Sequence, residues 1–168
     1  SNITYFKTDS FESNPRFSPC GNYIGFLKRK GDKLYGINNA VSIRSLDGKM
    51  ERALADTPNG GPFLSGPNLL GWNKDGTGLF FFEPKNTKFE LYLVPIDGGE
   101  PKPLIKDRAF VREPALNQDK TAISFVKQAP DTAPEVYFST LEEFNPIKAS
   151  SINDKSLPIA KTEKIAWE

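Results

Sequence analysis

A ten-residue pattern occurs three times in this chain and constrains its fold more than any other feature. The copies align without gaps and are Phe17–Phe26 (FSPCGNYIGF), Trp72–Phe81 (WNKDGTGLFF) and Leu116–Phe125 (LNQDKTAISF). Each has a large apolar residue, a polar turn and then a run of strand-forming residues. The turns Ser18–Gly21 and Asn73–Gly76 carry the residues that tight turns need, whereas Asn117–Lys120 lacks the glycine.

A second pattern follows each copy of the first. Its copies are Val41–Gly48 (VSIRSLDG), Leu91–Gly98 (LYLVPIDG) and Val136–Glu143 (VYFSTLEE). Each is a strand that enters an acidic turn, and two of the three turns contain Asp-Gly, a strong hairpin signal. A short strand is expected after each, around residues 50–54, 101–105 and 146–149.

Four antiparallel strands in each period of roughly 40–50 residues are typical of a propeller blade. The starting residues Phe17, Trp72 and Leu116 are 55 and 44 residues apart. The longer first interval contains the Gly- and Pro-rich stretch 56–67, which we expect to be an exposed loop. The sequence therefore predicts an all-β partial β-propeller of three four-stranded antiparallel blades, at about residues 3–56, 68–106 and 110–152. Trp72 is expected in the core between blades, and residues 1–2 look like a cleavage scar.

The composition limits which ligands the chain can be expected to bind. Lys and Arg number 22 and Asp and Glu 21, so charge gives no reason to expect binding to nucleic acid or to an anionic membrane. No apolar stretch approaches the roughly 18 residues that span a bilayer. A cytoplasmic and a periplasmic location both stay open.

The chain contains no histidine and one cysteine. Histidine is the usual general base for a Ser or Cys nucleophile, so its absence excludes a Ser-His-Asp triad within this chain and also a Cys/His metal site. Cys20 lies in a predicted turn, where we expect an ordinary surface thiol. No pair of acids stands out. The sequence therefore predicts no catalytic, cofactor-binding or metal-binding residue.

The repeated motifs resemble those of a known family. Pro15–Phe26 and Leu91–Gly99 are similar to the WD-like repeats of the prolyl oligopeptidase family of serine peptidases, which includes dipeptidyl and acylaminoacyl peptidases, and to the TolB propeller. Cys20 replaces the usual acidic residue of the first motif. The run Lys161–Trp167 resembles the segment that leads from the last blade of such peptidases into the α/β-hydrolase domain; alternatively, it is a terminal strand of alternating polarity.

This resemblance implies that residues 153–168 are a linker strand toward a missing α/β-hydrolase domain. That domain of the same full-length protein would be the partner of this chain and would carry the catalytic residues, so the chain would be inactive alone. The propeller would narrow access so that short peptides reach the active site. Arg16, Arg112 and Glu113 are the charged candidates for its rim, although solvated loop charges would look the same.

Two other functions fit the sequence. The chain could be a TolB-like or lectin-like module that binds a protein or a carbohydrate without catalysis. A small adhesive β-domain is less favoured because it would not explain the aligned Asp-Gly turns. Since three blades cannot close a ring, both flanks are expected to be apolar, and self-association of the open fragment is a further hypothesis.

Overall fold

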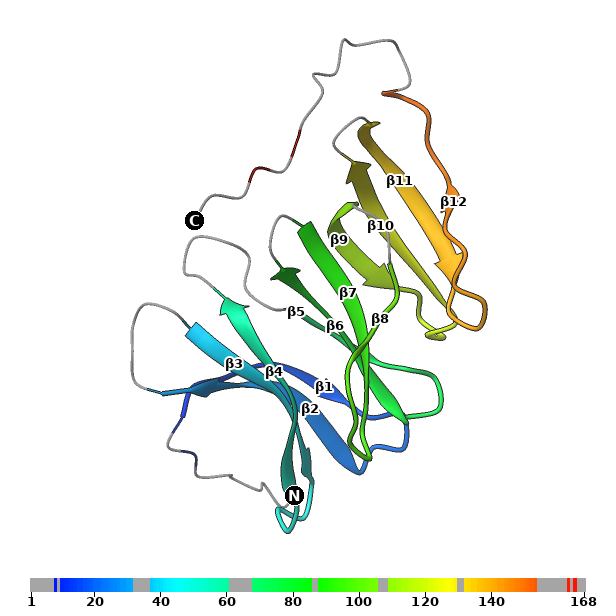
Figure 1. Cartoon of the computed structure of the whole chain (residues 1–168). Coiled ribbons are helices and arrows are strands. Elements are labelled where there is room, and N and C mark those ends of the chain that lie inside the picture. Colours follow the sequence, from blue (N-terminus) through cyan, green and yellow to red (C-terminus); the bar gives the residue numbers. More distant parts are fainter. Residues whose placement is uncertain are drawn as a thin grey trace.

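A computed structural model describes residues 8, 10–31, 37–60, 68–85, 88–105, 109–129, 132–153, 163 and 165. It contains three four-stranded antiparallel sheets in which each strand pairs with the next one along the chain. The sheets stack side by side in chain order (Figure 1). The prediction of an all-β partial propeller with three four-stranded blades is confirmed.

The strands follow the predicted order. Blade 1 contains β1 (Glu12–Phe17), β2 (Tyr23–Lys30), β3 (Ile37–Ser45) and β4 (Glu51–Gly60). Blade 2 contains β5 (Asn68–Trp72), β6 (Gly78–Lys85), β7 (Lys88–Pro95) and β8 (Lys102–Pro103). Blade 3 contains β9 (Phe110–Leu116), β10 (Ala122–Ala129), β11 (Thr132–Thr140) and β12 (Ile147–Lys148). The first strands lie beside one another, because β1 contacts β5 and β5 contacts β9.

Apolar layers between neighbouring blades form the core. Side chains alternate between the two faces of a strand, so each sheet has a backward face toward the previous blade and a forward face toward the next. The forward face of blade 1 and the backward face of blade 2 share one cluster, which contains Leu27, Val41, Ile43, Trp72, Leu79 and Phe81. The corresponding cluster between blades 2 and 3 contains Phe82, Leu91, Val111, Ile123 and Phe125.

The first hairpin turn repeats in all three blades down to single hydrogen bonds. The side chains of Ser18, Asn73 and Asn117 each accept from the backbone N–H five residues later, at 3.0 Å in every blade. Glycine occupies the left-handed position of the turn in blades 1 and 2, as Gly21 and Gly76, with φ of 73° and 69°. Lys120 takes that position in blade 3 with φ of 55°. The third turn therefore keeps the same conformation although a lysine replaces the glycine.

The predicted loop at residues 56–67 is wrong in its first part. β4 continues to Gly60, and Thr57 is fully buried with its hydroxyl donating to the Asn39 carbonyl at 3.0 Å. A shift in register between Ile37 and Asn39 accommodates Pro58, which cannot donate to the strand ladder. Residues 61–67 lie outside the described residues, as do the predicted scar at 1–2 and most of the predicted linker strand at 153–168.

The repeated apolar residue does not have the same surroundings in every blade. Phe17, Trp72 and Leu116 end the first strands and face Ile24, Leu79 and Ile123 in the same register. Trp72 is 1% exposed between blades 1 and 2, as predicted, but Phe17 is 66% exposed. Trp72 has the blade before it to pack against, and within the described residues Phe17 has no such blade.

The two flanks of the arc also differ from each other. On the backward face of blade 1, the Arg44 guanidinium lies 4.7 Å from the centre of the Phe26 ring and pairs with Glu12 and Glu51. Lys28 binds Glu51 from the same side. This flank is therefore charged, and the expectation of apolar flanks on both sides is wrong here.

The forward face of blade 3 is the apolar flank. Val136 and Phe138 are 43% and 44% exposed, whereas their equivalents Val41 and Ile43 in blade 1 are buried. Ile147 on the edge strand β12 is also exposed. Within the described part of the chain there is no helix of the length and apolarity that crossing a bilayer requires.

Candidate functional site

Two acidic side chains meet on the backward face of blade 2. Glu83 in β6 and Glu90 in β7 are directly opposite each other in the antiparallel ladder, so their side chains leave the sheet on the same face. They are 7% and 8% exposed. Buried acids are uncommon unless something compensates their charge, so their surroundings bear directly on function.

Glu90 is compensated by its neighbours. The Tyr92 hydroxyl donates to Glu90 Oε2, and the Lys85 ammonium lies 3.9 Å from the same oxygen. The Lys85 Nζ is also 5.6 Å from the centre of the Tyr92 ring, and that ring stacks on Phe81 with 5.2 Å between centroids. Alternation along the strands brings these groups together, because residues two apart share a face.

Glu83 has less compensation. Its Oε2 is buried and has no hydrogen-bond partner in the described residues. Burial raises the pKa of Glu83 to about 7; nearby Glu90 also raises it, and Lys85 opposes the shift. Burial, together with the hydrogen bond to Glu90, raises the pKa of Tyr92 well above its usual range. Near neutral pH, Glu83 therefore exchanges between the acid and the carboxylate.

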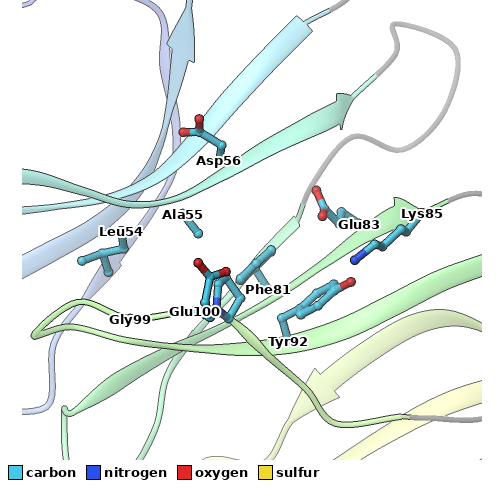
Figure 2. Close-up of a pocket in the computed structure, with 10 residues that line it drawn as sticks. Leu54, Ala55, Asp56, Phe81, Glu83, Lys85, Tyr92, Gly99 and Glu100 are labelled. Carbon is cyan, nitrogen blue, oxygen red and sulfur yellow. The ribbon is translucent and has the colours of Figure 1, made fainter.

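Glu83, Lys85 and Tyr92 line a cavity of about 500 Å³ between blades 1 and 2, which we call the acidic pocket (Figure 2). Blade 1 contributes Leu54, Ala55 and Asp56 from β4, and blade 2 contributes Phe81, Glu83, Lys85, Tyr92, Gly99, Glu100 and Pro101. Asp56 and Glu100 are exposed, and Glu83 is buried. In Figure 2 the Lys85 and Tyr92 side chains converge beside Glu83.

Sequence reasoning missed this pair of acids. Glu83 and Glu90 are seven residues apart and lie on different strands, and only the hairpin register makes them neighbours. A usable signal was an acid at the end of each of two apolar runs joined by a short hairpin. Pairing the two runs from that hairpin would have placed the carboxylates opposite each other.

The three predicted rim residues all lie within first strands. Arg16 is in β1, and its Nε donates to the Leu70 carbonyl of β5 at 3.1 Å, so it ties blade 1 to blade 2. Arg112 in β9 donates to Gln128 at 3.3 Å. Glu113 adopts φ of 51° at an irregularity of β9, as Asn14 does with φ of 54° at the equivalent point of β1.

Arg112 and Glu113 come together, whereas Arg16 lies apart from them. The pair lines a groove of about 380 Å³ on the forward face of blade 3, together with Val126, Pro134, Glu135, Val136, Ser150, Ile152 and Asn153. Glu135 is 4% exposed and accepts from the Ser150 hydroxyl and, at 2.6 Å, from the Asn153 N–H. Glu135 therefore fixes the segment that follows β12.

Cys20 lies in the first turn with an exposed thiol, as predicted. Hydrogen bonds with the Ser18 side chain and the Asn22 backbone lower its pKa. Among the residues that the structure describes, no three His, Cys, Asp or Glu side chains are placed to hold a metal ion.

No protein-family model and no curated protein matches this sequence. Solved structures do match it. TolB from Acinetobacter baumannii has a TM-score of 0.62 at 16% identity, over 83% of this chain and 33% of that one. A prolyl endopeptidase has a TM-score of 0.62 at 10% identity, over 86% of this chain and 22% of that one. An oligogalacturonate lyase in complex with manganese has a TM-score of 0.65 at 8% identity, over 88% of this chain and 43% of that one.

These likenesses bear on the fold. TolB propellers and prolyl peptidases are both among the structures that this chain resembles, so the resemblance inferred from the repeated motifs is confirmed at the level of the fold. The chain spans between about a fifth and a half of the length of these proteins. At these low sequence identities the likeness shows the fold alone, so a function has to be argued from the residues of this chain.

Proposed function

We propose that this chain is the propeller part of a prolyl oligopeptidase-family serine peptidase and restricts access to a catalytic domain outside residues 1–168. The observation that carries this proposal is the pair of motifs Pro15–Phe26 and Leu91–Gly99. The first forms the β1–β2 hairpin of blade 1, and the second forms β7 and the turn that leads to β8 in blade 2. The likeness to a prolyl endopeptidase supports it. The chain has no histidine, so it cannot supply a Ser-His-Asp triad itself.

The proposed role is steric. A ring of blades around a narrow channel admits an extended peptide and excludes a folded protein, and it also keeps bulk water away from the enclosed site. The adjacent first strands β1, β5 and β9 would line that channel. Arg16 would act as a brace between blades 1 and 2, because its side chain is hydrogen-bonded to β5.

The test begins with the reading frame that encodes residues 1–168. An adjoining α/β-hydrolase domain with a Gly-x-Ser-x-Gly elbow supports the proposal, and a reading frame without one contradicts it. The two parts, produced together, should cleave short chromogenic peptides and leave a folded protein intact. Residues 1–168 alone should show the blank rate even at high concentration. Turnover that survives rigorous purification of the isolated chain would also contradict the proposal.

A binding module without catalysis is the second candidate. TolB and the lyase resemble this chain as closely as the peptidase does, so the fold favours none of the three. The acidic pocket and the groove on blade 3 are surfaces that such a module could use. A reading frame that holds blades but no hydrolase domain would decide for this candidate.

A further inference from the structure

The acidic pocket contains a carboxylate that the fold leaves without a partner. Glu83 is only 7% exposed, and within the described part of the chain its Oε2 accepts no hydrogen bond. Leaving such a group unsatisfied is costly, whereas replacing it by an apolar residue of similar shape would not be. A cation bound beside this carboxyl group would stabilise its charged form.

The charges around Glu83 favour a cation. Among the described lining residues, the acids Asp56, Glu83 and Glu100 outnumber the one cation, Lys85. Asp56 is paired with Lys30 at the surface of blade 1, and Lys85 is directed to Glu90. No described set of three ligating side chains suits a metal ion, so an organic cation fits the pocket better.

The walls of the pocket favour an alkyl chain next to that cation. Leu54, Ala55 and Pro101 are apolar, and the Phe81 ring lies stacked on Tyr92. The structure already holds one ammonium group beside these rings, because the Lys85 Nζ lies 5.6 Å from the centre of the Tyr92 ring. Ammonium groups are attracted to the faces of aromatic rings in this range of distances.

We propose that the acidic pocket is a binding site for a primary alkylammonium ligand. Its ammonium group donates to Glu83, and its alkyl chain packs against Phe81, Leu54 and Pro101. The cavity of about 500 Å³ lies within the usual range of small-molecule sites, which is roughly 300–1,000 Å³. This site is independent of the proposed peptidase function, because it lies between β4 of blade 1 and β6–β8 of blade 2.

The experiment is a calorimetric or NMR titration of the purified chain at pH 8 with n-butylammonium and with 1,4-diaminobutane. Glu83→Gln removes the charge and keeps the shape, and it should weaken binding about tenfold or more, as expected for a hydrogen bond to a charged group. Lys85→Met removes the internal competitor and should strengthen binding about two- to fivefold. Glu142→Gln, an exposed acid of blade 3, is the matched control and should change nothing.

A second set of titrations distinguishes recognition of the cation from nonspecific binding of an alkyl chain in an apolar cavity. The neutral analogue 1-butanol should not bind saturably. Binding of n-butylammonium should weaken from pH 8 to pH 5, because Glu83 becomes protonated while the ligand stays charged. The groups that face Glu83 are Lys85, Glu90 and Tyr92 on its own blade, Asp56 on blade 1 and Glu100 before β8. Equal affinity in Glu83→Gln, equal binding of butanol, or no saturable binding would each overturn the proposal.

Discussion

The indole of Trp72 in blade 2 donates through Nε1 to the carbonyl oxygen of Arg16 in blade 1, with 2.9 Å between the two atoms. The hydrogen bond crosses an apolar layer in which Gly25 lets the blades approach closely. A Cβ at Gly25 would lie 2.9 Å from Leu79 Cδ2. Trp72 therefore joins the two sheets by packing and also by a directed polar contact.

Trp72→Ala should lower the free energy of unfolding by about 3–5 kcal/mol, the usual cost of emptying a large aromatic site in a core. Trp72→Phe keeps most of the ring and loses the hydrogen bond, so about 1.5–3 kcal/mol is expected. Urea denaturation measures both values. Phe17→Ala is the matched control at the equivalent register position and should stay within about 0.5 kcal/mol, because Phe17 is exposed. Similar losses at both positions would contradict this account of the arc.

The pKa of Glu83 predicts an unusual pH dependence of stability. The folded pKa of about 7 is above the ordinary value of 4.5, so the folded state binds more protons between these two values. Stability contributed by the protonated acid is present below about pH 4.5 and is lost as the pH rises to about 7. Glu83→Gln should therefore raise the free energy of unfolding at pH 8 by roughly 1–3 kcal/mol and leave it little changed at pH 4.

The measurement is chemical denaturation at half-unit steps from pH 4 to pH 8. The wild-type profile should fall across this interval relative to that of Glu83→Gln. Glu142→Gln, which changes an exposed acid, should keep the wild-type slope. If Glu83→Gln runs parallel to the wild type, then Glu83 does not have a raised pKa in the folded protein.

Local chemistry explains what the sequence could predict. The turns at Gly21 and Gly76 depend on residues within a few positions of each other, and the two strands beside each turn follow from it. Because this unit recurs, the blade and the number of blades could be read without any knowledge of distant contacts. The turn at Lys120 could be recognised from the repeat even though it lacks the glycine, because it keeps the same conformation.

The features that the sequence could not predict depend on neighbours. The exposure of Phe17 is set by what lies on the backward face of blade 1, and no residue near Phe17 carries that information. The Arg44 contacts with Glu12 and Glu51 join residues that are 32 and 7 positions away. Likewise, the pairing of Glu83 with Glu90 follows from the register of β6 and β7, and a shift by one residue would separate them.

The third hairpin turn offers a stabilising substitution. Lys120 holds φ of 55°, a conformation that costs an L-residue energy and that glycine adopts freely. Lys120→Gly should therefore raise the free energy of unfolding by roughly 0.5–1 kcal/mol, after allowance for the greater freedom of glycine in the unfolded chain. Thermal or urea denaturation measures the change.

The converse substitution is the control for that turn. Gly76 has φ of 69° at the equivalent position of blade 2, and a Cβ there would meet Pro19 Cδ at an ordinary contact distance of 3.4 Å. Gly76→Ala should destabilise by about 1 kcal/mol through its backbone conformation alone. A loss of stability in Lys120→Gly would show that the lysine side chain contributes more than its backbone strain costs.

The difference between the two flanks predicts how the isolated chain would self-associate. The forward face of blade 3 exposes Val136, Phe138 and Ile147, whereas Arg44 and its partners cover the backward face of blade 1. An apolar face placed against blade 1 would have to desolvate these charges, which is unfavourable. We therefore expect two copies to associate through their blade 3 faces, as two sheets packed face to face.

Light scattering over a range of concentrations tests this expectation. The mass should rise above the 18.7 kDa of one chain as concentration increases. Phe138→Ser combined with Val136→Thr should weaken the association about tenfold or more, because it removes the apolar centre of the face. Phe11→Ser, which alters a more exposed phenylalanine outside blade 3, should associate like the wild type. A strictly monomeric mass at high concentration, or equal weakening by Phe11→Ser, would show that this face does not pair.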